Sequence, residues 1–166
     1  MNTNQMKKIL EEVRQYDPSI LFVITRSTNT NLVCYKPKYR NGRLDRVSPL
    51  DVFWFNKDPD TLRQNNNQAI EQLSWMESKF AYGYTVKNYT LGCVVLSMVA
   101  DPKTDLSIIQ DLHSSYPSVK CMMGTKQLKG MFIQTVSGFI KPSVSYVDLF
   151  YQNTSGTLSK KRKFPS

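Results

Sequence analysis

Two apolar runs separated by a short polar segment constrain the fold more than any other part of this chain. Residues 20–26 read ILFVITR and residues 32–35 read LVCY, rich in the β-branched and aromatic side chains that favour strands. The segment between them, residues 27–31, reads STNTN, and Asn tolerates the left-handed backbone angles of tight turns. The pattern predicts a β-hairpin, followed after a polar loop by a third strand at residues 51–55.

The rest of the chain predicts two helices and further strands. Residues 4–16 have apolar side chains at helical spacing and end before Pro18, and residues 67–82 repeat that spacing up to Gly83. Strands are expected at residues 84–89, 91–100, 119–123, 130–136 and 144–151, with a turn at 101–105 and either a strand or a helix at 106–112.

Strands spaced this closely pair antiparallel, because parallel pairing needs long crossover connections. We therefore expect an α+β, mainly β fold: an antiparallel sheet, as a sandwich or partly closed barrel, with an N-terminal helix and one inserted helix. A chain of 166 residues fits one globular domain, here residues 1–158 with the helix docked on it, followed by a basic tail at residues 159–166.

The cysteines and the N-terminus favour an intracellular protein. Cys34, Cys93 and Cys121 are widely spaced and form no C-x-x-C pair, so neither a metal site nor a disulfide scaffold is predicted. Residues 1–5 lack the apolar core of a signal peptide. No apolar run approaches the length of a membrane span, so no membrane partner is expected.

Positive charge is in excess. The chain has 22 Lys and Arg against 13 Asp and Glu, a formal net charge of +9. Such an excess favours an anionic partner, although general solubility also explains it. The cations gather in a loop with Asn41-Gly42 as its turn and at the C-terminal end. These partner-binding candidates are Lys36, Lys38, Arg40, Arg43, Arg46, Lys160, Lys161, Arg162 and Lys163.

Several stretches in a fixed order carry a family resemblance. They are Arg26-Ser-Thr-Asn29-Thr-Asn31 with Val33 and Tyr35, then Pro49 ahead of Val52-Phe53-Trp54, Lys79-Phe80-Ala81-Tyr82-Gly83, Val144-Ser-Tyr146-Val147 and Thr154-Ser-Gly156. This order resembles the family DUF4833, a domain of unknown function, over about residues 20–158. The resemblance implies a domain boundary and a fold, and it supplies no catalytic residues.

No catalytic constellation is predicted. The single histidine, His113, is not tied by any spacing to Cys121 or to a serine, and no glycine-rich phosphate loop is present. We therefore expect no enzyme activity, no cofactor and no metal. The carboxylates near the basic loop are expected to be surface ion partners of its cations: Asp45, Asp51, Asp58 and Asp60.

The motif positions offer a candidate ligand site, because Arg presents a planar fork of donors and Asn both donates and accepts. Its residues are Arg26, Asn29, Asn31, Lys79 and Tyr82. The alternative is structural: Arg26 pairs with a carboxylate, the asparagines close the turn, and Tyr82 caps the helix.

Three functions follow from these features. The leading one is a non-enzymatic structural or interaction protein whose basic surfaces dock on an acidic assembly. Because tubulin lattices are acidic, its specific form is a microtubule-associated protein of the cilium or axoneme, in the cytoplasm and cytoskeleton. The second is a nucleic-acid or ribonucleoprotein subunit, with the nucleus as the alternative compartment, although no recognition module is visible. The third is a small anionic-ligand-binding or hydrolase-like module that uses Arg26, Asn31 and Tyr82.

Overall fold

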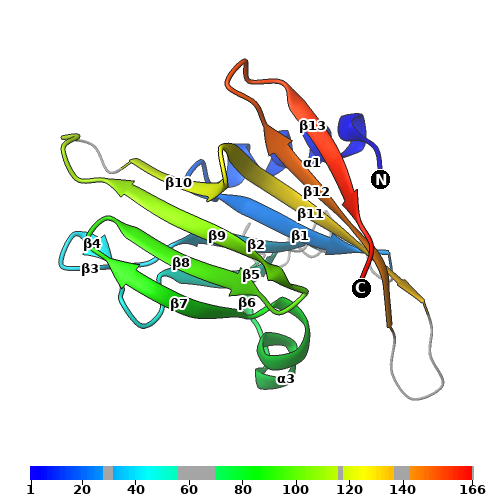
Figure 1. The fold of residues 1–166 in the computed structure, drawn as a ribbon, viewed down its shortest axis with the longest axis horizontal. Helices are drawn as coiled ribbons and strands as arrows, with labels where there is room; N and C mark the ends of the chain where they lie inside the picture. The colour runs from blue at the N-terminus through cyan, green and yellow to red at the C-terminus, as the bar shows by residue number, and fades with distance from the viewer. Residues whose placement is uncertain (28–31, 56–69, 116–117, 137–142, 166) are drawn as a thin grey trace.

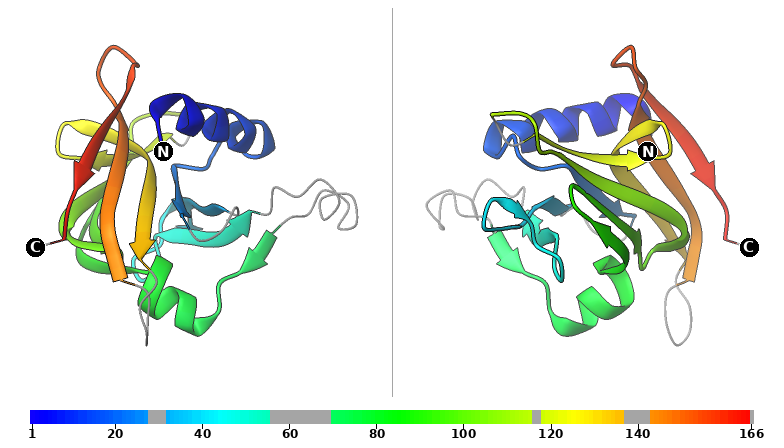
Figure 2. Two further views of the ribbon diagram at one scale, coloured as in Figure 1. Left: turned by 90° about the vertical axis from the view of Figure 1, so that its right-hand side faces the viewer. Right: turned by 60° about the vertical axis from the view of Figure 1, so that its left-hand side comes forward.

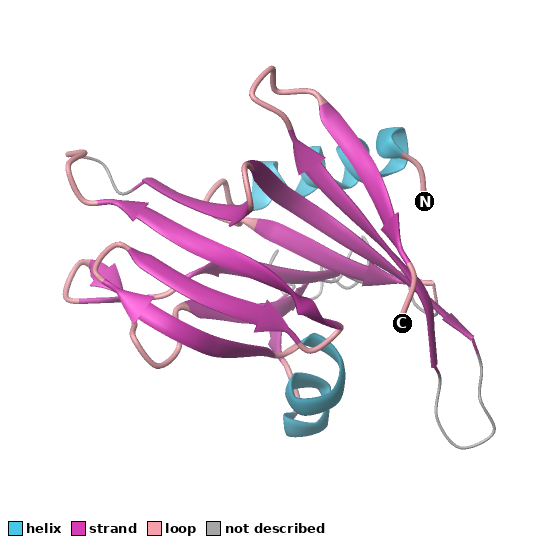
Figure 3. Cartoon of the chain, in the orientation of Figure 1, coloured by secondary structure: helices cyan, strands magenta, loops and turns pink. Residues whose placement is uncertain are grey.

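The computed structural model describes residues 1–27, 32–55, 70–115, 118–136 and 143–165, and this part of the chain is mainly β (Figures 1 and 3). The helical segments are α1 (Thr3–Tyr16), α3 (Trp75–Glu77) and the π-helix η1 (Ser78–Tyr82). The strands are β1 (Phe22–Arg26), β2 (Leu32–Pro37), β3 (Tyr39–Arg40), β4 (Arg43–Leu44), β5 (Leu50–Phe55), β6 (Ile70–Gln72), β7 (Tyr84–Thr90), β8 (Cys93–Met98), β9 (Asp101–Asp111), β10 (Ser118–Met123), β11 (Lys126–Val136), β12 (Ser143–Gln152) and β13 (Leu158–Lys163).

Strand β11 is the centre of an 11-stranded sheet. One edge of β11 pairs with β12, which in turn pairs with β13. Its other edge is shared, because β10 pairs near Lys126 and the β1 strand pairs further along, with Val23 opposite Gly130. The sheet therefore divides into two wings, β1-β2-β5-β6 and β10-β9-β8-β7.

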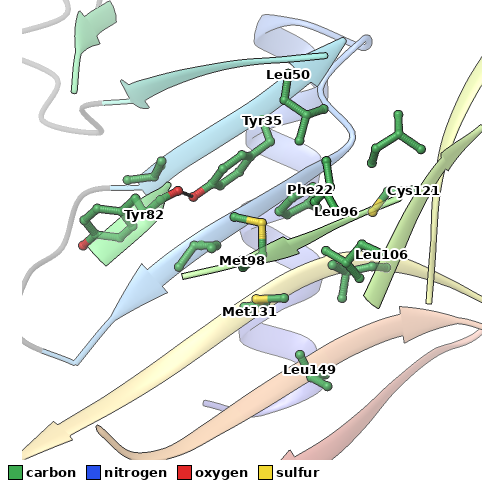
Figure 4. Packing of buried hydrophobic residues seen from close by; sticks show 14 of the residues in the cluster. Phe22, Tyr35, Leu50, Tyr82, Leu96, Met98, Leu106, Cys121, Met131 and Leu149 are labelled. Atoms are coloured by element: carbon green, nitrogen blue, oxygen red, sulfur yellow. Dashed lines mark hydrogen bonds between the residues drawn. The ribbon is translucent and has the colours of Figure 1, made fainter. Parts of the chain in front are cut away.

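The two wings curl toward each other and form a half-barrel (Figure 2). Buried side chains from both wings fill its interior, among them Phe22 and Tyr35 from one wing and Leu96 and Leu106 from the other (Figure 4). The Tyr84 hydroxyl links the wings, because it donates to the Leu50 carbonyl at 2.8 Å. The predicted mainly β, partly closed antiparallel architecture is confirmed, with the parallel β1–β11 pair as an exception.

Helix α1 packs on the outside of the sheet. Its buried residues Met6, Ile9 and Val13 contact apolar side chains of β1, β2, β5, β11 and β12. A Cβ atom at Gly130 would lie 2.7 Å from the Met6 sulfur, so this glycine allows the close approach of the helix. The predicted helix at 4–16 is confirmed, but it begins at Thr3 and is capped by the Asn2 side chain.

Parts of the secondary structure differ from expectation. The helix expected at 67–82 is wrong over residues 70–74, because 70–72 form β6 and a capping box at Ser74 starts the helical turns at Trp75. Residues 67–69, the first part of the expected helix, lie outside the described residues. Residues 101–105, expected as a turn, form the first part of strand β9. Because β9 continues to Asp111, the segment 106–112, expected as a strand or a helix, is mostly strand.

The cationic segment expected as a C-terminal tail forms edge strand β13. Its backbone bonds to β12 place Asp148 opposite Arg162 and Leu149 opposite Lys161. The alternation of apolar and polar residues that predicts strands is missing here, since most of the segment is charged. Charged side chains are common on edge strands because they discourage pairing with other chains.

Candidate functional site

The structure brings two of the motif residues together where β1 meets the end of η1. The Nη2 atom of Arg26 donates to the Ala81 carbonyl at 3.1 Å, and its guanidinium lies 4.9 Å from the centre of the Tyr82 ring. Trp54 contacts the same ring edge-on at 5.1 Å. The Nε atom of Arg26 is buried and has no hydrogen-bond partner among the described residues.

Backbone groups at the end of η1 fix this contact. The Tyr35 hydroxyl donates to the Tyr82 carbonyl at 2.5 Å inside the core, as Figure 4 shows. Burial raises the pKa of Tyr35 well above its ordinary value, so the hydroxyl remains a neutral donor. A Cβ atom at Gly83 would lie 1.8 Å from the Ser78 carbonyl oxygen, so only glycine fits where the π-helix ends. The Ala-Tyr-Gly motif thus ties the inserted helical turn to β1 and β2.

The other candidate ligand residues lie apart or cannot be placed. Lys79 is exposed, with its ammonium 4.7 Å from the Trp75 ring and 5.5 Å from the Phe80 ring. Asn29 and Asn31 lie outside the described residues. The described part of the proposed ligand site is therefore the Arg26–Tyr82 contact.

The basic loop is a fixed hairpin made by β3 and β4, and we call residues 38–47 the basic hairpin. Asn41 and Gly42 have φ of 53° and 76°, which suits a tight two-residue turn. Leu44 is buried, and its amide donates to the Gln110 Oε1 atom at 3.1 Å. The Gln110 Nε2 atom also donates to the Gly42 carbonyl at 3.0 Å. Strand β9 therefore holds the hairpin at one end of the half-barrel (Figure 1).

The register of the basic hairpin places two arginines side by side, because Arg40 is the cross-strand partner of Arg43. Both are exposed, as are Lys38 and Arg46, whose guanidinium lies 5.5 Å from the Tyr89 ring. In the part of the chain that the structure describes, no carboxylate forms an ion pair with any of these cations.

Two charged side chains at or beside the basic hairpin, Asp45 and Lys36, differ from its exposed cations. The Asp45 carboxylate accepts from the Ser48 and Val47 amides, and these bonds, with Lys38 and Arg40 nearby, hold its pKa below the ordinary value. Lys36 is different from the hairpin cations, because its ammonium lies 3.5 Å from the Asp17 carboxylate.

Two of the four cations of β13, Arg162 and Lys163, pair with carboxylates of the same chain. Arg162 binds both carboxylate oxygens of the buried Asp148, at 2.8 and 3.2 Å. The Lys163 ammonium lies 3.0 Å from both Asp101 oxygens. Lys160 donates to the Met1 carbonyl at 3.2 Å, and Lys161 is exposed. Sequence reasoning missed the acceptors Asp101 and Asp148 because they lie far from these cations along the chain.

No catalytic or metal centre is seen among the described residues. No group of three or more His, Cys, Asp or Glu side chains there could hold a metal ion. His113 is exposed, and burial raises the pKa of the Cys121 thiol so strongly that the thiolate is disfavoured. None of the described helices is long and apolar enough to span a lipid bilayer.

These features define a mainly β half-barrel domain with an outer N-terminal helix and an inserted helical turn. The chain belongs to the family described as Domain of unknown function (DUF4833), whose model matches residues 22–162. The match includes the Arg26 and Tyr82 positions and most of β13, whereas α1 precedes it. No match was found among curated proteins or among solved structures.

Proposed function

We propose that this chain is a non-enzymatic interaction protein that docks through its basic hairpin on an acidic macromolecular surface. The observation that carries the proposal is the direct opposition of Arg40 and Arg43 on a hairpin that is fixed to β9. Like charges on directly opposed strand positions destabilise a hairpin. A partner that supplies carboxylates would relieve this repulsion and gain bidentate contacts from each guanidinium.

The hairpin is a better docking surface than β13. The side chains of Arg162 and Lys163 already contact Asp148 and Asp101, so a partner would have to compete with these pairs. The hairpin cations have no such pair among the described residues, and their backbone is held in place. A preorganised surface loses little conformational entropy on binding.

The finer form of the proposal is that the acidic surface is a microtubule lattice, in a cilium or elsewhere in the cytoskeleton. It is supported by the net charge of +9 and by the exposed arginine pair, both suited to an acidic polymer. Nucleic acid is the second candidate, because the exposed Tyr39 precedes Arg40 on the hairpin and could stack on a base.

Co-pelleting with polymerised tubulin tests the proposal. The variant Arg40→Gln/Arg43→Gln removes two charges from the basic hairpin, and Lys160→Gln/Lys161→Gln removes two from β13 as the matched control. Exposed ion pairs contribute about 0.2–1 kcal/mol each. With two charges removed, we therefore expect the hairpin variant to bind about 2- to 30-fold more weakly at about 0.15 M salt, and the control to bind nearly as the wild type does.

Parallel assays with polyglutamate and with single-stranded RNA separate the alternatives. Binding to polyglutamate but not to microtubules would support an acidic protein partner and reject the microtubule. Binding to RNA alone, with a steep salt dependence, would replace the proposal with the nucleic-acid function. Equal binding by the hairpin variant and the wild type would reject the basic hairpin as the docking surface.

A further inference from the structure

A cavity of about 620 Å³ lies beside α1 and contains neither the basic hairpin nor the Arg26–Tyr82 contact. One flank of α1 forms a wall, and the connection to β1 and the turn between β12 and β13 form the others. This flank carries Lys7 and Arg14, together with Leu10, which also packs at the edge of the buried stripe of the helix. Ligand sites for small molecules commonly have volumes of about 300–1,000 Å³.

A β-bulge places a lysine in this cavity. On β11 the pairing with β12 shifts between Leu128 and Gly130, so Lys129 has no cross-strand partner. Leu128 points into the half-barrel core, and Gly130 lies beneath Met6 of α1. The extra residue, Lys129, lines the cavity, and it also lines a neighbouring cavity of about 270 Å³. Bulges commonly redirect a side chain in this way.

Basic side chains outnumber acidic ones in the lining of this cavity. Lys129 is half-buried, and burial together with nearby Arg14 lowers its pKa from the ordinary value. Glu11 also lines the cavity, yet no ion pair in the described ranges includes Lys129, Arg14 or Lys7. A partly desolvated ammonium without a counterion is unfavourable, so an anion is the natural complement.

The rest of the lining is suited to a hydrocarbon chain. Leu10, Ile20, Leu21 and Leu158 lie on its walls, and all four are only partly buried. We propose that this cavity binds a small amphiphilic organic anion, a carboxylate or phosphate monoester on a medium-length alkyl chain, with its headgroup on Lys129 and Arg14. The site combines the family module with α1, which precedes the family match.

Isothermal titration calorimetry with decanoate and with decyl phosphate, each below its micelle concentration, tests this site. The two anions distinguish a carboxylate from a phosphate headgroup, and decanol is the neutral control. The variant Lys129→Met keeps the length of the side chain and removes its charge. The matched control is Lys126→Met on the same strand, whose ammonium lies over the Tyr151 ring outside the cavity.

We expect at least one anion to bind. Lys129→Met should weaken the binding of this anion about 10-fold or more, as fits the loss of one charged hydrogen bond. Lys126→Met should change its affinity less than about 2-fold. Arg14→Gln, on the exposed side of α1, provides a second variant if Lys129→Met does not fold, with an expected weakening of about 3-fold. No binding by either anion, or equal binding of decanol and decanoate, would overturn the proposal. Unchanged affinity in folded Lys129→Met would also overturn it.

Discussion

Replacing Gly83 by alanine tests the account of the inserted helical turn most sharply. The backbone of Gly83, with φ of −72° and ψ of 177°, is one that alanine adopts without strain. The added methyl group would lie 1.8 Å from the Ser78 carbonyl oxygen, whereas ordinary contacts begin near 3.4 Å. The turn must therefore move, which weakens the hydrogen bonds to the Tyr82 and Ala81 carbonyls. At about 1 kcal/mol each, with some lost packing of buried Tyr82, the expected destabilisation is about 2–3 kcal/mol.

Urea unfolding followed by tryptophan fluorescence measures this change as a lower midpoint at an unchanged slope. Gly124→Ala is the matched control, because Gly124 has φ of 62° and no atom within 4 Å of an added Cβ. Gly124→Ala should lower the free energy of unfolding by about 1 kcal/mol, because alanine disfavours the left-handed backbone conformation at this position. If Gly83→Ala proves no more destabilising than Gly124→Ala, the steric account of the motif glycine is refuted.

Three further predictions follow from the contacts in the core and at its edge. A thiol reagent should modify the partly exposed Cys93 in the native protein and all three cysteines only after unfolding, since Cys121 is buried and its pKa is raised. Tyr35→Phe should lower the free energy of unfolding by about 1–2 kcal/mol, because the Tyr82 carbonyl loses its buried donor. Asp17→Asn should cost at most about 0.5 kcal/mol at neutral pH. Burial raises the pKa of the Asp17 carboxyl, but the hydrogen bonds from Ser19 and the nearby Lys36 outweigh this effect, so the pKa is lower in the folded protein than in the unfolded chain. The stability that the Asp17 carboxylate contributes is therefore fully present above its unfolded-state pKa and should be lost as the pH falls through its folded-state pKa. A urea titration at neutral and at acid pH checks this last prediction.

Local patterns predicted the parts of the fold that are stabilised locally. The runs around residues 20–35 form the β1–β2 hairpin, with Val23 opposite Cys34, and the periodicity of residues 4–16 gives α1. The parallel β1–β11 pair depends on contacts between distant segments and has no local signature. Strand β13 has no apolar alternation either, because hydrogen bonds to β12 and pairs with distant carboxylates hold it in the sheet.

In the candidate sites, too, the features set by local sequence were predicted and those set by contacts between distant segments were not. The position of the basic hairpin followed from its charges and its Asn-Gly turn, whereas its attachment through Gln110 depends on the tertiary fold. Lys129 was not predicted as a site residue, since one lysine in a strand is usually solvent-exposed. The adjacent Gly130 was a signal of a bulge or a close backbone approach, and the structure has both.

The most direct test of the central claim is to map the surface that an acidic polymer contacts. At 19.2 kDa the protein suits backbone amide NMR spectroscopy, with polyglutamate added at low and at moderate salt. We predict that the largest shift changes fall on the basic hairpin, residues 38–47, and that β13 changes little. Shift changes centred on β13, or none at all on the hairpin, would contradict the account.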